Sequence, residues 1–431
     1  MKIAVIGGAG VRTPLLVHGL CNSDLPIHEL TLYDTDHDRL DLIEPLVRQL
    51  AGHIRLSAHS AVSECVDGAD FVFTSIRVGG IEGRARDEAA ILRRGVVGQE
   101  TIGPGGFAMA MRTIPHMLEF AAEITRRAPR AWIVNFTNPV GIITQAVASE
   151  TGARIIGICD TPAELFHDLA RVIGLPATEC YFDYFGLNHL GWVREVYFDG
   201  KPQMERLWKA PEKLGAVYRH DLFDADFLQK LRMLPTEYLF YYYRPETAAQ
   251  NLRKAGTTRG AAVERLNAGL FAELARPGVD RLRVYEDYLS ARNASYMQLE
   301  TGGPAAAPVS PWAMPTGYDK IAMSVVRAIH FNAGSIIPLN VLNVGNLSCL
   351  EASDIVEVPC VVNANGALPM NVGPVPESVR DLIVRVKEYE RATIRAAVSG
   401  DRGMACDALS RNPLVANAAT ATLLLSDLGL P

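Results

Sequence analysis

Short apolar runs alternate with longer stretches of helical periodicity over the first 160 residues. The apolar runs predict five buried strands, and the segments between them predict four helices. The predicted strands are 3–6, 30–33, 71–74, 132–135 and 154–159, and the predicted helices are 14–22, 36–51, 106–128 and 139–151. This alternation is typical of a doubly wound α/β fold, in which a parallel sheet carries helices on both faces.

The pattern changes after residue 160. Residues 181–187 and 192–198 predict a pair of strands with a turn at Asp199-Gly200, and 203–300 predicts a long helical region. The Gly/Pro/Ala-rich stretch 301–311 predicts a loop, 336–341 and 355–362 predict strands, and 376–428 is mostly helical. We therefore expect a Rossmann-type domain at 1–160 and an α+β domain at 161–431.

Composition narrows the class of protein. The chain has 431 residues, is 48% hydrophobic and 21% charged, and carries a net charge of −6 with no run of Lys or Arg. This balance argues against nucleic acid or an anionic membrane as the main partner. Seven scattered cysteines argue against a disulfide framework or a structural zinc site. We find no signal-peptide pattern and no membrane-length apolar run, so we expect a cytoplasmic protein.

A glycine-rich turn follows the first predicted strand. Gly8 and Gly10 let backbone N–H groups approach a pyrophosphate, and Thr13 is expected to cap the next helix. Asp34 closes the second strand, where a ribose-binding acid favours NAD over NADP. Thr13 replaces the third glycine of the dinucleotide motif, so a plain glycine turn in another α/β fold stays an alternative. The expected cofactor-binding residues are Gly8, Gly10, Val11, Arg12, Thr13, Asp34 and Arg39.

Polar segments follow other predicted strands, at 77–88 and 135–139, and 98–107 predicts a glycine-rich loop. Cys159 comes just before Thr161 and Glu164, which predict a capping box, and a helix N-terminus there favours a thiolate. His189 follows a further strand. Taken singly, a buried cysteine is more often a packing residue and a lone histidine more often structural.

As a set, these motifs resemble glycoside hydrolase family 4, the NAD- and divalent-metal-dependent glycosidases, and most closely its 6-phospho-glucosidase branch. The motifs that carry the resemblance are the turn at 7–14, Arg84 with Asp87-Glu88, 98–107, 135–139, Cys159, Asn188-His189, 234–243 and 358–360. The resemblance implies that Cys159 and His189 are ligands of Mn²⁺ or another divalent transition metal. It also implies that Tyr238 is the catalytic base, and that the substrate is bound by Arg84, Asn138, Asp160, Asn188 and Arg259.

The resemblance further implies a redox mechanism on a small glycoside with an anionic group at C6. NAD⁺ takes hydride from C3 of the sugar, Tyr238 removes the C2 proton, and the C1 leaving group is eliminated. Water then adds and the hydride returns to C3. Tyrosine has an ordinary pKa near 10, so we expect the metal and Arg259 to supply positive charge near Tyr238. Family members commonly form dimers or tetramers, so a homo-oligomer is expected.

Two departures leave the substrate open. The phospho-glucosidase branch usually has Gly-Gly-Gly-Ser with an aromatic residue before Thr-Pro. This chain has Gly8-Ala9-Gly10-Val11-Arg12 before Thr13-Pro14, so the serine hydroxyl is missing at position 10 and an arginine stands at position 12. The residues after Cys159, beginning with Asp160, match neither the α-acting nor the β-acting pattern in full. We therefore favour a 6-phospho-glucoside, with β slightly preferred over α, and keep a sulfonate, carboxylate or unmodified C6 as alternatives. Rival classes are a lactate/malate-type 2-hydroxy-acid dehydrogenase and a non-enzymatic NAD sensor.

Overall fold

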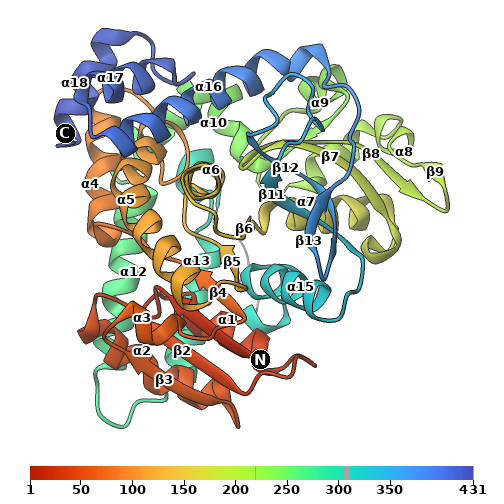
Figure 1. Ribbon diagram of the computed structural model, residues 1–431. Coiled ribbons are helices and arrows are strands. Elements are labelled where there is room, and N and C mark those ends of the chain that lie inside the picture. Colours follow the sequence, from red (N-terminus) through yellow and green to blue (C-terminus); the bar gives the residue numbers. More distant parts are fainter. Residues whose placement is uncertain (219, 305–309, 431) are drawn as a thin grey trace.

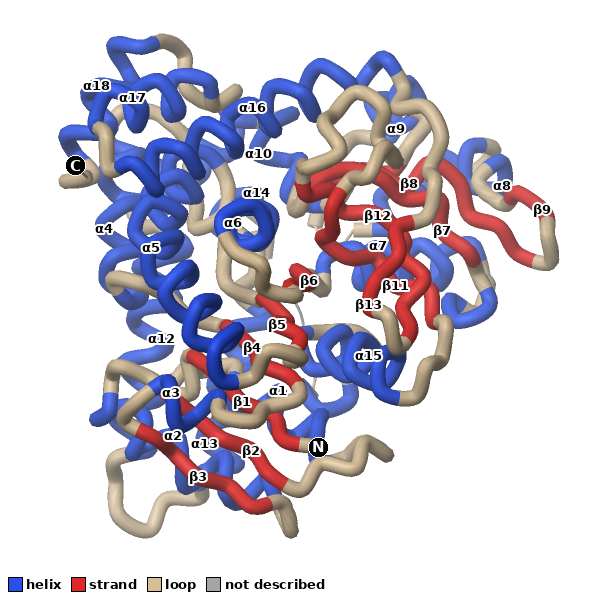
Figure 2. The backbone as a smooth tube through the Cα atoms, viewed as in Figure 1, coloured by secondary structure: helices blue, strands red, loops and turns tan. Residues whose placement is uncertain are grey.

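The structure is a computed structural model that describes residues 1–218, 220–304 and 310–430. Its largest sheet has nine strands in the order β13-β12-β11-β6-β5-β4-β1-β2-β3 (Figures 1 and 2). The parallel part consists of β1 (Lys2–Ile6), β2 (Glu29–Tyr33), β3 (Arg55–His59), β4 (Phe71–Thr74), β5 (Trp132–Asn135) and β6 (Ile155–Gly157). All five strands predicted in this half are present. The sequence pattern missed β3, because this edge strand buries only the side chain of Leu56 fully.

Helices cover both faces of this part of the sheet. They are α1 (Thr13–Cys21), α2 (His37–Ala51), α3 (Val62–Val66), α4 (Gly80–Arg93), α5 (Gly103–Arg127) and α6 (Val140–Glu150). The four predicted helices are present, whereas α3 and α4 were not predicted. The loop expected over 98–107 is wrong in its second half, because α5 begins at Gly103. A Cβ at Gly105 would lie 2.2 Å from the carbonyl oxygen of Gln99, so this glycine serves close helix–loop packing.

A second, smaller sheet follows, in the order β10-β8-β7, with β9 paired to β8. Its strands are β7 (Tyr181–Leu187), β8 (Leu190–Phe198), β9 (Lys201–Pro202) and β10 (Leu234–Pro235). Strand β8 begins two residues before the predicted 192, so Asn188-His189 alone connects it to β7. The predicted Asp199-Gly200 turn connects β8 to β9.

The region predicted as helical between 203 and 300 is a series of short and medium helices. Together with the helix that precedes the small sheet, they are α7 (Thr161–Ile173), α8 (Glu205–Trp208), α9 (Ala225–Leu231), α10 (Phe240–Tyr243), α11 (Pro245–Ala255), α12 (Arg259–Leu274), α13 (Arg281–Ala294) and α14 (Gln298–Thr301). The predicted loop at 301–311 lies partly outside the described residues, which omit 305–309.

The last third of the chain returns to the large sheet. Strands β11 (Ser335–Leu342), β12 (Ile355–Asn363) and β13 (Gly366–Pro369) extend it antiparallel beyond β6. The helices of this third are α15 (Tyr318–His330), α16 (Glu377–Ser399), α17 (Arg402–Arg411) and α18 (Ala418–Asp427). Helix α16 packs on α5, and Figure 1 shows the blue C-terminal helices beside the orange α4 and α5. The large sheet therefore crosses residue 160, and the predicted two-domain division stays a prediction.

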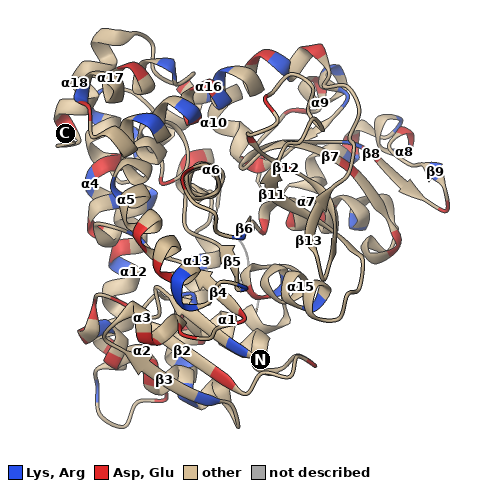
Figure 3. Ribbon diagram, viewed as in Figure 1, with Lys and Arg blue, Asp and Glu red and all other residues tan. Residues whose placement is uncertain are grey.

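Charge is distributed over the whole molecule. In Figure 3, Lys and Arg are interspersed with Asp and Glu along the helices. Within the described ranges, none of the helices has both the length and the apolar character that crossing a bilayer requires.

Candidate active site

A cavity of about 530 Å³ lies at the carboxyl ends of the parallel strands. Residues just beyond β1, β2, β4, β5 and β6 contribute to its wall, namely Gly7, Asp34, Ser75, Phe136 and Ile158. Strand β1 has β2 on one side and β4 on the other, and open α/β sheets bind ligands at such a reversal of strand order. Twelve of the fifteen predicted site residues line the cavity: Gly10, Val11, Arg12, Asp34, Arg39, Arg84, Asn138, Cys159, Asp160, His189, Tyr238 and Arg259.

The glycine turn lies tightly against the neighbouring strands. A Cβ on Gly7, which has φ +96°, would lie 2.3 Å from the carbonyl oxygen of Ser75, and one on Gly8 would lie 2.9 Å from Leu32 Cβ. Gly8 thus packs against β2 and does not line the cavity. Thr13 does not cap α1 as predicted, because its hydroxyl donates to the carbonyl oxygen of Gly7 at 3.3 Å.

Asp34 lies where the ribose-binding acid was expected, directly after β2. Its carboxylate accepts hydrogen bonds from the backbone N–H of Ala9 at 2.9 Å and of Asp36 at 3.1 Å. These bonds tie the end of β2 to the glycine turn. Arg39 forms ion pairs with Asp36 at 3.2 Å and with Glu82 at 2.9 Å, at the same edge of the cavity.

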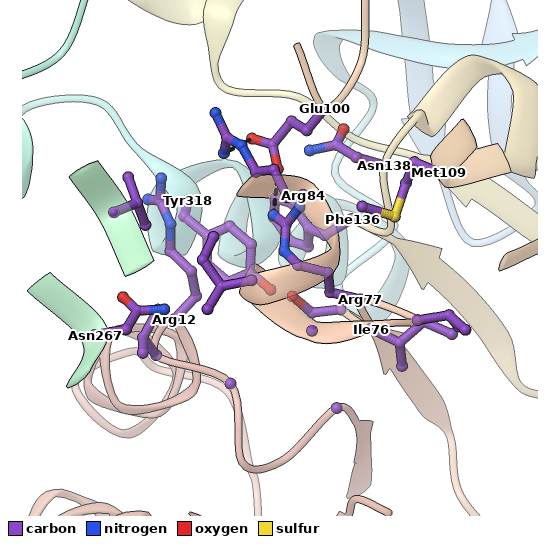
Figure 4. Close-up of a pocket in the computed structure, with 18 of the residues that line it drawn as sticks. Arg12, Ile76, Arg77, Arg84, Glu100, Met109, Phe136, Asn138, Asn267 and Tyr318 are labelled. Atoms are coloured by element: carbon purple, nitrogen blue, oxygen red, sulfur yellow. Dashed lines mark hydrogen bonds and ion pairs between the residues drawn. The ribbon is translucent and has the colours of Figure 1, made fainter. Parts of the chain in front are cut away.

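Arg12 lies at the N-cap of α1, directly after the glycine turn. Its guanidinium carbon is 5.6 Å from the centre of the Tyr318 ring, and Figure 4 shows the two side chains together near Asn267. Burial opposes its charge, but the Asp160 carboxylate, together with the phenols of Tyr288, Tyr285 and Tyr318, raises the pKa of Arg12 above its ordinary value. Arg12 is therefore a charged residue of the cavity wall.

Cys159 and His189 meet across the two sheets. Cys159 follows β6 of the large sheet, and His189 lies in the β7–β8 turn with φ +60°. The Cys159 Sγ and His189 Nε2 atoms are 3.3 Å apart, while His189 Nδ1 lies 2.8 Å from Thr101 Oγ1. A histidine whose Nδ1–H is held by a neighbour keeps Nε2 free for a metal. A thiolate with an imidazole is a transition-metal donor set, so the two residues fit the expected ion.

Burial sets the protonation of this pair. It lowers the pKa of His189 to about 3, so the imidazole is neutral, as a metal ligand must be. Burial, reinforced by Glu357 and Asp160, raises the pKa of the Cys159 thiol well above its ordinary value. The expectation that the helix start favours a thiolate is wrong for the protein alone. The predicted capping box is also not formed, because α7 has Asp160 at its N-cap, without a side-chain cap bond.

Tyr238 stacks on the histidine of this pair. The Tyr238 and His189 rings are parallel within 7°, with centroids 3.8 Å apart. Burial, together with Glu237, raises the pKa of Tyr238 well above its ordinary value. Arg84 is a cation that acts on this phenol. Arg259 was expected to do so, but its guanidinium donates to the Ser295 hydroxyl at 2.6 Å and to backbone carbonyls at the end of α13.

A cluster of buried charges that acts on Tyr238 forms part of the cavity wall. Figure 4 shows three of its members, Arg77, Arg84 and Glu100. Arg84 Nε lies 2.7 Å from Glu88 Oε1, and its Nη1 lies 2.9 Å from Glu100 Oε1. Arg77 pairs with the other oxygen of Glu100, and Arg292 also acts on this carboxylate. Burial opposes the charge of Glu100, but Arg77 and Arg84 hold its pKa well below the ordinary value. The wall therefore keeps its charges at neutral pH, with arginines in excess around Glu100.

Comparison with known families decides the class of this site. Residues 2–175 match the model described as family 4 glycosyl hydrolase, and residues 184–415 match that of the family 4 glycosyl hydrolase C-terminal domain. The chain belongs to glycosyl hydrolase family 4.

Relatives in the family cover nearly the whole chain. It is 30% identical to a probable 6-phospho-beta-glucosidase of Bacillus subtilis, over 99% of this chain and 95% of the relative. It is similar to the structure of a 6-phospho-alpha-glucosidase from gut microorganisms in complex with NAD and glucose-6-phosphate (28% identity, 99% and 96% of the two chains, TM-score 0.83). It is also similar to the 6-phospho-beta glucosidase of Thermotoga maritima with manganese, NAD⁺ and glucose-6-phosphate (26% identity, 99% and 97%, TM-score 0.82).

Membership of family 4 confirms the resemblance that the motifs carried, but the structure adds residues to the site that we had not predicted. Arg77, Arg292 and Glu100 line the cavity, and Thr101 orients His189. Arg77 belongs to the polar segment 77–88, and Glu100 and Thr101 belong to the predicted glycine-rich loop 98–107. Arg292 lies in a helix in which no motif indicated a functional residue. Conversely, the predicted substrate ligand Asn188 donates to Glu357 Oε1 at 3.2 Å, behind the cavity wall.

Proposed function

We propose that the chain is an NAD- and divalent-metal-dependent glycosidase that hydrolyses a 6-phospho-glucoside, with the β anomer slightly preferred. The observation that carries the proposal is the arrangement of Cys159, His189 and Tyr238 on one wall of the cavity that begins at the glycine turn. This arrangement combines a metal donor pair and a phenol base next to a dinucleotide-type turn. The lactate/malate-type dehydrogenase alternative is disfavoured, because family 4 is a glycosidase family.

The residues around the cavity have separable roles in this proposal. The glycine turn and Asp34 bind the dinucleotide, and Cys159 with His189 holds the metal. When bound, NAD⁺ supplies a hydride acceptor for C3 of the sugar, and the metal supplies a Lewis acid beside that carbon. Thr101 keeps the His189 ring oriented toward the metal position. Asn138 lines the same wall and is available to a sugar hydroxyl.

Tyr238 carries the proton-transfer step. In its phenolate form, Tyr238 would accept the proton from C2, which is acidic once C3 is a carbonyl, and departure of the C1 substituent would follow. The ring is fixed for this step by stacking on His189 at 3.8 Å. Because the C1 substituent leaves from the position β to the C3 carbonyl, after the C2 proton has been removed, the elimination can proceed from either anomer, and relatives of both kinds are similar to this chain.

The charged wall supports an anionic substituent at C6. Arg12, Arg77, Arg84, Arg259 and Arg292 all line the cavity, and guanidinium groups are suited to phosphate oxygens. Solved relatives hold glucose-6-phosphate. A second candidate is the same reaction on a glycoside with a C6 sulfonate or carboxylate, because guanidinium groups such as that of Arg12 also bind anions of this kind.

Hydrolysis of the α- and β-nitrophenyl glucoside 6-phosphates tests the proposal. Release of nitrophenol should require both NAD⁺ and Mn²⁺, should stop with a chelator, and should be absent in Cys159→Ser and His189→Ala. The same assay with 6-sulfonate and glucuronide substrates separates the second candidate. Turnover by protein shown to be free of cofactor, or undiminished turnover by the Cys159 variant, would contradict the proposed mechanism.

A further inference from the structure

The two metal-binding side chains proposed above belong to different sheets. Cys159 is attached to the large sheet at the end of β6, and His189 to the small sheet at the turn between β7 and β8. Their separation of 3.3 Å therefore depends on how firmly the two sheets are joined at this point. Strand β12 of the large sheet packs against β7 of the small one.

Glu357 lies on β12 at this junction and is 1% exposed. Its carboxylate accepts hydrogen bonds from Tyr184 Oη at 2.6 Å, from Asn188 Nδ2 at 3.2 Å and from Asn340 Nδ2 at 2.7 Å. Tyr184 is on β7, Asn188 precedes His189 in the turn, and Asn340 is on β11. One side chain thus bonds to the small sheet, the turn and the large sheet together.

The hydrogen-bond partners of the Glu357 carboxylate are unusual for a buried acid. Its hydrogen-bond partners among the described residues are two amides and a phenol, none of which carries a positive charge. Burial of this carboxyl group without a cation raises its pKa to about 7, so its negative charge is costly to hold there. The turn that Glu357 holds through Asn188 carries His189, so a divalent ion on the Cys159–His189 pair would bring a positive charge to this turn.

We propose that Glu357 is the positioning residue of the metal site, clamping the Asn188–His189 turn to the large sheet and providing a negative charge behind the bound ion. The role of Glu357 in metal binding rests on the proposed function, because it requires a metal on Cys159 and His189. The clamp on the Asn188–His189 turn does not require the metal. Outer-shell residues of this kind usually contribute about 10- to 100-fold to metal affinity.

Metal binding and local exchange test the two halves. Mn²⁺ would be titrated into metal-free wild type, Glu357→Gln and Glu357→Ala, with free Mn²⁺ measured by electron paramagnetic resonance. Asp354→Asn is the matched control, because Asp354 is equally buried just before β12 but pairs with Arg391. We expect both Glu357 variants to bind Mn²⁺ about 10- to 100-fold more weakly, with the control near wild type. NAD⁺ affinity should be unchanged in all three variants.

Hydrogen–deuterium exchange of the peptide 186–193 in the metal-free proteins provides the second readout. Exchange should be faster in Glu357→Ala than in the Asp354 control at equal global stability, with Glu357→Gln between them. Mn²⁺ affinities of both Glu357 variants at the wild-type level would overturn the proposal. If wild type binds no Mn²⁺, or Cys159→Ser binds it equally well, the proposed function fails. Unchanged exchange of 186–193 in Glu357→Ala would then overturn the clamp independently.

Discussion

Replacing Tyr238 by Phe isolates the proton-transfer step, because it removes one hydroxyl and leaves the ring in place. The ring of residue 238 stacks on His189 at 3.8 Å and 7°, a contact that Phe retains. The hydroxyl itself interacts with Tyr296. We expect loss of this neutral hydrogen bond to lower the free energy of unfolding by about 1 kcal/mol, which leaves the variant folded.

The effect on the rate should be much larger than the effect on stability. A positioned general base contributes about 10²- to 10⁴-fold, which corresponds to about 3–5 kcal/mol in the activation free energy. Tyr241→Phe is the control, since Tyr241 lines the same cavity and is more buried than Tyr238, but its hydroxyl donates to Glu300 at 3.2 Å. The control should lose far less in kcat than Tyr238→Phe.

Two measurements, C2 proton exchange and NAD⁺ reduction, show which step of the reaction Tyr238→Phe prevents. Glucose 6-phosphate incubated in D₂O with NAD⁺ and Mn²⁺ should exchange its C2 proton with wild type and with the Tyr241 control, as followed by NMR. Tyr238→Phe should lose this exchange while its NAD⁺ is still reduced when the sugar binds. C2 exchange at the wild-type rate in Tyr238→Phe would refute the assignment of the base. Loss of NAD⁺ reduction as well would mean that Tyr238 acts in binding rather than in proton transfer.

Three further predictions follow from the buried charges. Mn²⁺ affinity should rise about tenfold per pH unit near neutrality, because the pKa of Cys159 is raised and binding therefore displaces a thiol proton. His189 has a pKa of about 3 and releases no proton. Calorimetry that gives two protons released per ion would contradict this. Arg292→Ala should raise KM about 10- to 100-fold for a 6-phospho-glucoside but little for the plain glucoside, and equal effects would remove Arg292 from C6 recognition. Lys387→Met should lower the free energy of unfolding by about 3–5 kcal/mol in urea denaturation, because it leaves the buried carboxylate of Glu390 without its ion-pair partner. A loss no larger than that of an exposed lysine variant would contradict this.

The sequence was most informative where local pattern and function coincide. Strands buried on both faces appear as continuous apolar runs, so β1, β2, β4, β5 and β6 were recognisable, and the rule that ligands bind at their carboxyl ends located the cavity. Cys159 and His189 were proposed as partners from family resemblance alone. The structure brings them within 3.3 Å, although the residues are 30 positions apart and on different sheets.

Residues whose role depends on packing between distant segments could not be predicted. Glu357 is a single carboxylate in an apolar strand, and only the fold brings Asn188 to it. Arg292 lies on a helix whose apolar periodicity is weak, so its face could not be assigned. The thiolate predicted for Cys159 failed for the opposite reason. A helix start favours negative charge locally, but complete burial, together with neighbouring carboxylates, outweighs it.

The activation of Tyr238 is the energetic problem that this architecture has to solve. Burial, Glu237 and Glu100 all raise the pKa of Tyr238, so the protein's own groups make it a poor base near neutral pH. Arg84 opposes them, but its guanidinium is shared with Glu88 and Glu100. The remaining positive charge has to come from what the cavity binds next to His189, whose ring touches the phenol. Proton abstraction is therefore coupled to occupancy of the site, and a tyrosine is suited to this coupling because it stays protonated until the cation and the sugar are both in place.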